Sequence, residues 1–418
     1  MDIIVIGAGI VGMTTAWELA RDGHRVTVID RAAGPAEGAS HANGGQLSYS
    51  YVAPLADGSI WRQLPKLMLD RDSPVQFRPG IDPFQYRWLA QFLLACNDRQ
   101  ARDTIDRLGA LAQLSRDVLH ATDELADADF AWSRTGKLVV HSNDESFAAA
   151  RRHAEHQAAS GTERRALDRD ACLSLEPALA GIADRVVGGL FSPGDEAADA
   201  HLLAQALERR LRTGAGDVRF LFGTTVTGLR REGGKVVAVE SADGALEADL
   251  YVLAAGVGAR ALARTVGVDL PIYPLKGYSL SAPAAADATA PRVSITDAKR
   301  KVVLARLGDS LRVAGAADLV GETTSIDTRR TDKLLADARA DFPDAADWNA
   351  VKLWAGLRPA TPRGTPILGD SGLDRLLLNV GHGALGLTLA FGSASALAAH
   401  IAGRPSPAPV SLFALKHR

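Results

Sequence analysis

Residues 3–30 read IIVIGAGIVGMTTAWELARDGHRVTVID, and this stretch decides the fold. Residues 3–6 form an apolar, mostly β-branched run of the kind that is buried on both faces in a parallel sheet. The motif G-x-G-x-x-G follows at residues 7–12. Apolar side chains recur at helical spacing over 10–21, and a second strand is expected at 25–29. The stretch therefore predicts a strand, a glycine turn, a helix and a second parallel strand.

Each glycine of this motif has a physical reason to be a glycine. Gly7 makes the tight turn, Gly9 lets a pyrophosphate approach the backbone at the positive helix end, and Gly12 lets helix and strand pack closely. Asp30, at the end of the second strand, is placed to accept a ribose hydroxyl. Strand, turn, helix and acid together predict a dinucleotide site, against the alternative of a tight turn in a nucleotide-free α/β protein. The residues assigned to this end of the site are Ile6, Gly7, Gly9, Ile10, Val11, Gly12, Asp30 and Arg31.

Length and composition limit the remaining possibilities. The chain has 418 residues, 47% hydrophobic and 23% charged, which is typical of a soluble globular protein of two domains. Its 47 basic and 49 acidic residues give a net charge of −2, so it lacks the positive field of a nucleic-acid binder. Cys96 and Cys172 are too few for a disulfide framework, and both are interpreted as structural thiols in a reducing compartment.

Two segments bear on targeting. The residues after Met1 run directly into the predicted strand, which does not resemble a secretory signal. The longest stretch without Asp, Glu, Lys or Arg is Leu376–Gly403, but its glycines and polar side chains argue against a transmembrane helix.

The order of the later elements does not follow a serial βα pattern. Helices are expected near 84–96, 101–125, 201–212 and 328–341, and a final helix near 387–401. Strands are expected at 137–141, 188–191, 218–222, 225–229, 235–240, 248–256, 270–281, 302–306, 311–315 and 376–380. This irregular interleaving favours FAD over NAD as the dinucleotide.

Several blocks occur in an order that carries a resemblance. They are Ser40–Gln46, the stretch Pro271-Ile-Tyr-Pro-Leu-Lys-Gly-Tyr-Ser-Leu280, Trp354-Ala-Gly-Leu-Arg-Pro-Ala-Thr-Pro362, and Asn379–Thr388. With the glycine motif, they resemble FAD-dependent amino-acid oxidoreductases of the D-amino-acid oxidase superfamily, and most of all the bacterial D-amino acid dehydrogenases. The resemblance covers essentially the whole chain.

The resemblance implies an α/β (α+β) fold with a Rossmann-like FAD-binding domain and an interleaved antiparallel-sheet substrate domain. We expect FAD to lie at their junction. The approximate FAD-binding segments are 1–50, 145–180, 198–270 and 352–418, and the substrate-domain segments are 51–144, 181–197 and 271–351.

The resemblance also implies residue roles on the substrate side. Arg358 resembles the arginine that holds the substrate carboxylate, because a guanidinium matches a carboxylate bidentately. Tyr278 and Tyr273 are candidates for the substrate side, although a tyrosine at strand spacing is as often part of the core. Gln46 is expected to reach substrate from a glycine loop. His382 opens the segment expected to face the pyrimidine end of the flavin.

The remaining cofactor residues follow from the same comparison. Backbone amides at a glycine turn entering a helix would stabilise the anionic reduced flavin. The full set expected beyond the first motif is Ser40, Asn43, Gly44, Gly45, Gln46, Val226, Ala255, Gly256, Gly381, Gly383, Gly386, Leu387 and Thr388.

The implied activity is oxidative deamination of D-amino acids to 2-oxo acids and ammonia, with hydride transfer to FAD and electrons passed to a quinone or other respiratory acceptor. The alternatives are an oxidase of glycine, proline or sarcosine type that uses oxygen, and a flavin- or NAD-binding module without amino-acid chemistry. No cysteine lies near residues 354–358, so FAD is expected to be non-covalent. No metal site is expected from the ten histidines. Arg363 stands where related dehydrogenases commonly have an acid, which leaves the substrate preference open.

Partners and location are expected to follow from this chemistry. A D-amino acid and an electron acceptor are the expected partners, without nucleic acid, and the oligomeric state stays open. The expected location is cytoplasmic, with peripheral contact at the cytoplasmic face of the inner membrane. Residues 61–71, with Trp61 and several leucines beside basic residues, are one candidate contact, and a buried loop or helix face is the alternative.

Overall fold

A parallel sheet forms around the N-terminal strand. The computed structural model describes residues 1–50, 52, 56–58, 60, 61, 73–158, 163–214, 216–286 and 289–416. The sheet has the order β19-β20-β13-β1-β2-β9, and only the β19–β20 pair is antiparallel. Its strands are β1 (Asp2–Ile6), β2 (Arg25–Ile29), β9 (Val218–Leu221), β13 (Leu250–Leu253), β19 (Ile367–Asp370) and β20 (Leu376–Val380).

Both faces of this sheet are covered, as the apolar run at residues 3–6 predicts. Ile3 and Val5 pack into one core with the helices α1, α4, α7 and α10. Ile4 and Ile6 pack into a second core with α8 and a small antiparallel sheet. The covering elements are α1 (Ile10–Arg21), α4 (Asp98–His120), α7 (Ala200–Thr213), α8 (Ala259–Thr265), α10 (Gly386–Ile401), β10 (Val226–Glu232), β11 (Lys235–Ser241) and β12 (Gly244–Leu246).

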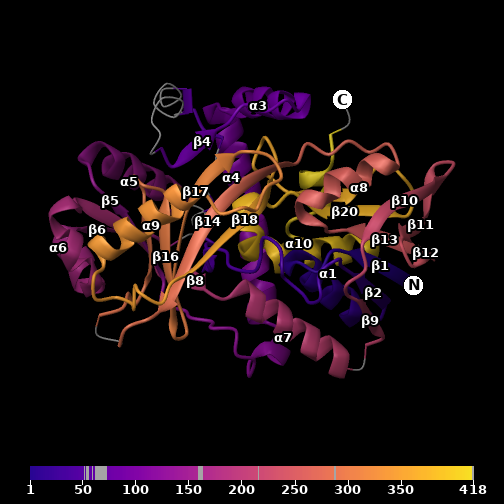
Figure 1. Ribbon diagram of the computed structural model, residues 1–418, viewed down its shortest axis with the longest axis horizontal. Helices are drawn as coiled ribbons and strands as arrows, with labels where there is room; N and C mark the ends of the chain where they lie inside the picture. Colours follow the sequence, from indigo (N-terminus) through magenta and orange to yellow (C-terminus); the bar gives the residue numbers. More distant parts are fainter. Residues whose placement is uncertain are drawn as a thin grey trace.

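A second, larger sheet lies beside the first (Figure 1). Its order is β18-β14-β17-β16-β15-β5-β7-β6, and β4 also pairs with β17. All pairs are antiparallel except β15–β5 and β17–β4. The strands are β4 (Val75–Phe77), β5 (Lys137–His141), β6 (Arg165–Asp168), β7 (Gly188–Ser192), β14 (Tyr273–Pro283), β15 (Ser294–Asp297), β16 (Val302–Leu307), β17 (Ser310–Leu319) and β18 (Lys352–Ala360).

Helices complete this second layer. Helix α9 packs on one face of the sheet, where Leu334 and Ala338 join a core with Leu280 and Val313. The remaining elements are α3 (Pro83–Ala95), α5 (Asp144–Ala158), α6 (Arg169–Leu175), α9 (Thr328–Asp341), the short pair β3 (Gln46–Leu47) and β8 (Glu196–Ala197), and the 3-10 turns Asp123–Leu125, Pro177–Arg185, Gly256–Gly258, Gly383–Leu385 and Val410–Phe413. The predicted combination of a Rossmann-like sheet with an interleaved, largely antiparallel sheet is confirmed.

Strand pairing and core packing differ from three of the predicted domain segments. Residues 145–180 were expected in the FAD-binding part, but their strand β6 pairs with β7 of the large sheet. Residues 352–360 were expected there too, but they form β18, which pairs with β14. Conversely, α4 lies in a segment assigned to the substrate domain, yet its Leu108 and Leu111 pack in the core of the parallel sheet. The β14–β18 pairing and the packing of α4 both join segments that lie far apart in the sequence.

The long uncharged stretch near the C-terminus is a core helix. Residues Gly383–Ile401 are long and apolar enough to cross a membrane, with a mean hydropathy of 1.5. Two thirds of that window is buried inside the protein, where α10 packs against α1 and α4. Its apolarity is therefore explained by packing within the fold, as the sequence predicted.

Candidate active site

The glycine turn after β1 is shaped by close backbone contacts. Gly7 has a φ of +109°, which favours glycine, and a Cβ at this position would lie 2.6 Å from the carbonyl oxygen of Ala254. A Cβ on Gly12 would lie 1.8 Å from the carbonyl oxygen of Gly7. At Gly9 the nearest atom to such a Cβ is Ser40 Oγ, at 3.7 Å. Gly7 and Gly12 are therefore required by the protein's own packing, whereas a Cβ on Gly9 would make only an ordinary van der Waals contact.

Ser40 and Asp30 lie beside this turn. Ser40 Oγ accepts a hydrogen bond from the Ile10 N–H at 3.2 Å, which ties the loop after β2 to the first residue of α1. Asp30 accepts from the Ala8 N–H at 2.7 Å and from the Ala32 N–H at 2.9 Å. A carboxylate has about four lone-pair sites, so Asp30 keeps capacity for a ribose hydroxyl.

The other residues predicted near the adenosine end lie close to the same turn. The Thr224 N–H donates to the Asp30 carbonyl, which brings the start of β10, and with it Val226, towards the end of β2. The segment 254–256 packs on Gly7, and Gly256 has a φ of +54° with open space at its Cβ position. Arg31 is exposed.

The segments predicted at the flavin ring meet each other. Thr388 Oγ1 donates to the carbonyl of Gln46 at 3.3 Å and accepts from the Ser48 N–H at 3.1 Å. A Cβ on Gly44 would lie 2.9 Å from Val303 of the large sheet, and Gly383 has open space. Leu387 points into the core with 4% of its surface exposed. The structure thus brings together the loop at 43–46 and the start of α10, two segments more than 300 residues apart.

Arg358 lies on β18 in a setting that fits an anion site. Its Nη1 donates to the carbonyl of Ala316 at 2.9 Å. Among the residues that the structure describes, no carboxylate forms an ion pair with it. Burial lowers the pKa of Arg358, an effect that Asp318 opposes, but a guanidinium stays charged at neutral pH. A partly buried cation with only a carbonyl partner is suited to bind a carboxylate.

Space for this guanidinium is made by a glycine in the neighbouring strand. A Cβ on Gly277 would lie 2.4 Å from Arg358 Nη2, so the guanidinium lies directly over Gly277. Ser279, two residues further on the same face of β14, donates to the carbonyl of Ala42. Arg358 therefore lies on the face of the large sheet that is turned towards the glycine loop at 42–46.

Trp354 was given no role by the sequence reasoning but lies on this same face. A Cβ on Gly356 would lie 1.9 Å from the six-membered ring of Trp354, so the indole covers Gly356. Positions 354, 356 and 358 alternate along one strand and share a face. That alternation was the signal that could have placed Trp354 beside Arg358.

The two predicted tyrosines do not join Arg358. Tyr278 is adjacent to Gly277 in β14 and therefore points to the opposite face, where Lys276 Nζ lies 5.3 Å from its ring centre. It is 2% exposed, and burial and the nearby Asp318 raise the pKa of its phenol. Tyr273 packs in an aromatic cluster, 5.7 Å from the ring of Trp88. Both placements correspond to the core alternative.

The side chains of Gln46 and His382 are engaged by the protein. Gln46 Nε2 donates to the carbonyls of Ile295 and Leu304 in the large sheet. His382 is 3% exposed, and its Nε2 lies 3.1 Å from Ser393 Oγ in α10. The backbone of His382 forms a bridge to Ala360, two residues after Arg358. These residues hold the loops together, and His382 connects the strand of Arg358 to the turn before α10.

We expect acid to destabilise the wild-type protein more than it destabilises a His382→Gln variant. Burial lowers the pKa of His382 from its ordinary 6.5 to about 3, so between these values only the unfolded chain binds the proton. The contribution of neutral His382 to stability is present above pH 6.5 and is lost as the pH falls, by about 1.4 kcal/mol per pH unit. In urea unfolding, the wild-type protein should lose about 2 kcal/mol more than the variant between pH 7 and pH 5. Equal losses would contradict this.

A buried lysine near Thr388 was also missed by the sequence reasoning. Lys137 is 4% exposed, and its Nζ donates to Ser48 Oγ at 2.8 Å. The N–H of the same Ser48 donates to Thr388. Burial lowers the pKa of Lys137 to about 8, although the buried Asp195 opposes this. A titratable cation is thus two hydrogen bonds from the start of α10.

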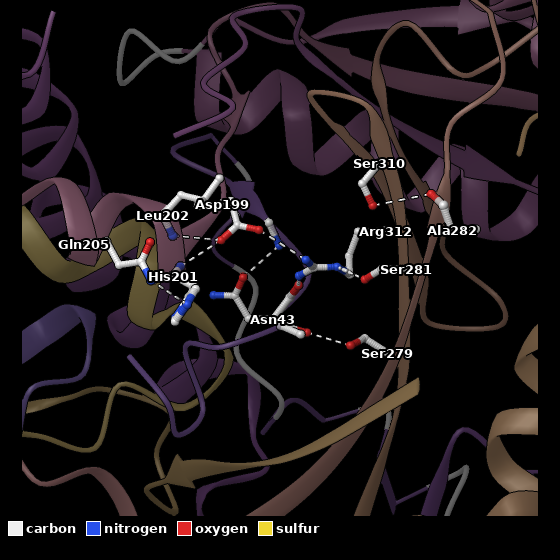
Figure 2. Close-up of polar contacts among 12 residues, drawn as sticks. Asn43, Asp199, His201, Leu202, Gln205, Ser279, Ser281, Ala282, Ser310 and Arg312 are labelled. Atoms are coloured by element: carbon white, nitrogen blue, oxygen red, sulfur yellow. Dashed lines mark hydrogen bonds and ion pairs between the residues drawn. The ribbon is translucent and has the colours of Figure 1, made fainter. Parts of the chain in front are cut away.

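Arg312, on β17, links the large sheet to the glycine loop at 42–46 and to α7 (Figure 2). Its Nε donates to Ser281 Oγ at 2.6 Å, its Nη1 to the carbonyl of Asn43 at 2.9 Å, and its Nη2 to Asp199 at 3.2 Å. Asp199 also caps α7 by accepting from the N–H groups of His201 and Leu202. Asn43 Oδ1 in turn accepts from the Gly45 N–H. A guanidinium of the large sheet therefore holds both the glycine loop and α7.

Replacing Arg312 with methionine should cost about 3 kcal/mol of stability, because it leaves the buried Asp199 carboxylate without its cation. Side-chain exposures of 9% for Arg312 and 12% for Asp199 place the pair away from solvent. Urea unfolding measures the loss. Asp199→Asn is the matched control, since asparagine still caps α7 and Arg312 keeps its two other partners. It should be less destabilising than Arg312→Met.

The residues around the glycine turn leave room and hydrogen-bonding groups for FAD. Gly9 leaves space for a pyrophosphate at the start of α1, and the first N–H groups of a helix lack partners within that helix. Asp30 keeps lone pairs at the end of β2, and Gly256 and Gly383 both leave open space. A dinucleotide fits this arrangement.

The fold and this glycine cradle define the class of two-sheet dinucleotide-binding oxidoreductases. The model of the family described as FAD dependent oxidoreductase (DAO) matches residues 2–400, and the chain belongs to this family. It is therefore an oxidoreductase that uses FAD, as predicted.

Named relatives extend this comparison. D-amino acid dehydrogenase 2 of Ralstonia nicotianae is 46% identical, covering 99% of this chain and all of that protein. D-amino acid dehydrogenase 2 of Pseudomonas aeruginosa is 44% identical, covering 96% of this chain and 95% of that protein. The crystal structure of glycine oxidase from Geobacillus kaustophilus has a TM-score of 0.75 at 20% identity, covering all of this chain and 98% of the other, and shows that the fold is shared.

Proposed function

We propose that this enzyme catalyses the oxidative deamination of D-amino acids to 2-oxo acids and ammonia. The observation that carries the proposal is Arg358, a partly buried cation without a carboxylate partner among the described residues, on the sheet face turned to the glycine loop. Relatives named D-amino acid dehydrogenase, 44–46% identical over nearly the whole chain, support the substrate class and its stereochemistry.

The reaction removes two electrons and a hydrogen from the substrate Cα and one proton from its amine. FAD, when bound, supplies the acceptor for the hydrogen and the two electrons that leave the substrate Cα. The lone pair of the neutral amine then forms the C=N bond of an imino acid, and water hydrolyses this product to the 2-oxo acid and ammonia.

The protein's part is binding and orientation. We assign to Arg358 the two hydrogen bonds that fix the carboxylate, which leaves the Cα hydrogen in one defined direction. The indole of Trp354 covers the strand beside this carboxylate and is suited to contact the substrate side chain. His382 points into α10 and Tyr278 lies on the far face, so the proposal gives neither residue a proton to carry. Their proposed part is to hold the loop and the strand in place.

An anaerobic screen tests the activity. The purified yellow enzyme is mixed without oxygen with matched D- and L-enantiomers, glycine, proline and sarcosine, and the flavin absorbance is followed. The proposal expects bleaching by D-amino acids and much slower bleaching by their L-enantiomers. Bleaching only by L-amino acids or by the secondary amines would overturn the substrate assignment. No bleaching by any compound would overturn amine oxidation itself.

For the second half-reaction, we infer that electrons pass to a quinone or another carrier. The test compares reoxidation of the reduced enzyme by air and by a soluble quinone. Faster reoxidation by quinone is expected, and rapid peroxide formation in air would instead assign an oxidase.

We also infer a cytoplasmic enzyme that touches the inner membrane peripherally. Of the candidate segment 61–71, residues 62–71 lie outside the described residues. Trp61 is 52% exposed while its indole N–H donates to the carbonyl of Cys96, and Leu94 is 76% exposed. These exposed apolar groups support a contact at this surface. In a density gradient, the enzyme should float with anionic lipid vesicles. A smaller fraction of a Leu94→Glu variant should float with them.

A further inference from the structure

Three side chains with metal-binding atoms meet beside the glycine loop. They are Glu37 and His41, from the loop after β2, and His201, from the first turn of α7. One carboxylate oxygen of Glu37 and one ring nitrogen of each histidine all lie within 4.8 Å of one another. The residues come from segments 160 positions apart, which is why the sequence predicted no metal site.

The distances approach those of a coordination sphere. Glu37 Oε2 lies 3.5 Å from His41 Nδ1, and the two imidazole rings have centroids 4.7 Å apart. With zinc bonds of about 2.0–2.1 Å, two ligands at tetrahedral angles are separated by roughly 3.4 Å. The Glu37–His41 edge already has this length. The third ligand needs only a small side-chain movement to close the remaining gap.

The histidines keep nitrogens free to bind. The Nδ1 atoms of His41 and His201 are both buried without a hydrogen-bond partner in the part of the chain that the structure describes. Gln205 lies 2.9 Å from His201 Nε2 and points towards it (Figure 2). The Gln205 atom in this contact is the amide nitrogen Nε2, which donates to His201 Nε2. When a cation binds Nδ1, the amide group turns over so that its oxygen accepts from Nε2–H and the lone pair lies on Nδ1.

The backbone that carries these ligands is held independently. The Ala36 N–H donates to the carbonyl of Ala8, and Arg312 holds the carbonyl of Asn43 on the other side of His41. Asp199 fixes the first turn of α7 at His201 itself. The three ligands therefore need little ordering when a cation binds.

We infer that Glu37, His41 and His201 form a binding site for a late first-row divalent cation such as Zn²⁺. Two imidazoles and one carboxylate favour Zn²⁺, Co²⁺ or Ni²⁺ over Mg²⁺ and Ca²⁺, which prefer oxygen ligands. Glu37 and His41 are partly exposed, so the cation enters from solvent and keeps a water in its fourth position. When occupied, the site joins α7 to the loop that carries Ser40 and Asn43.

Calorimetry on the FAD-loaded enzyme, after removal of metal with a chelator, tests the site. Titration with ZnCl₂ should show one equivalent bound at micromolar or lower Kd, and MgCl₂ should give no such binding. Glu37→Gln, His41→Ala and His201→Ala should each weaken Zn²⁺ binding at least tenfold. The control is His400→Ala, which removes a histidine that pairs with Asp370 elsewhere on the surface and should change nothing. Flavin absorbance and circular dichroism confirm that each variant is folded.

A second measurement separates this site from adventitious binding. Excess Zn²⁺ should raise the Tm of the wild-type enzyme by several degrees, because the cation binds only the folded arrangement, and the shift should disappear in His201→Ala. Absence of binding to the wild-type enzyme would overturn the inference. Unchanged binding in both histidine variants would overturn it too, since the cation would then lie elsewhere.

Discussion

Replacing Arg358 with alanine should raise KM for the D-amino acid by roughly 100-fold or more while FAD stays bound. Losing two charge-assisted hydrogen bonds to a desolvated carboxylate costs about 3–5 kcal/mol, and each 1.4 kcal/mol is a factor of ten. Arg358 lies over Gly277 on the large sheet, away from the glycine turn at Gly9, so its loss leaves the dinucleotide cradle intact. Steady-state kinetics with a dye acceptor measure KM, and the ratio of flavin to protein absorbance measures FAD content.

Two further variants sharpen this prediction. Arg358→Lys keeps a positive charge but loses the planar fork, so its KM should lie between those of the wild type and the alanine variant. Arg25→Ala removes an exposed arginine that pairs with Asp2 at the start of β2, and it should behave as the wild type. If Arg358→Ala had an unchanged KM, another group would have to bind the carboxylate.

The second large effect is expected at two glycines of one motif, with different consequences. Gly12→Ala should prevent stable folding, because its Cβ would lie 1.8 Å from a backbone oxygen that α1 cannot avoid. Gly9→Ala should fold normally, since its Cβ meets nothing nearer than 3.7 Å, but the methyl would occupy the path of the pyrophosphate. We expect Gly12→Ala to be insoluble or unfolded and Gly9→Ala to be folded and colourless.

Circular dichroism and FAD content distinguish the two outcomes. Gly109→Ala, in the middle of α4 with nothing within 4 Å of its Cβ position, should be yellow and slightly more stable than the wild type, because alanine is the better helix former. A fully yellow Gly9→Ala would mean that no phosphate approaches this residue. A stable Gly12→Ala would show that the close approach of α1 to the turn is not required.

The sequence could predict elements whose pattern is local. The bounds of α9 and β20 match the predicted ranges, because each has its own periodicity and clear ends. Domain membership was harder, since 145–180 joins the large sheet through β6, whose pairing with β7 leaves no mark in its own residues.

Prediction of the site was also limited where a residue's role depends on contacts with distant segments. Arg358 was predicted from its motif, but the side of β14 on which Tyr278 lies depends on the strand's orientation between α9 and the glycine loop. Arg312 and Lys137 have no local signal at all, because their roles come from Asp199, Asn43 and Ser48 in distant segments.

The pairing of the parallel sheet has a consequence for how the chain is made. β1 is synthesised about 250 residues before its neighbour β13, and β13 in turn pairs with the still later β20. Until β13 has been synthesised, the apolar strand at residues 3–6 has only β2 beside it. Such long-range pairing slows folding and exposes apolar strands to aggregation. Truncation before β20 should therefore yield an insoluble product, and slower synthesis at lower temperature should favour the folded enzyme.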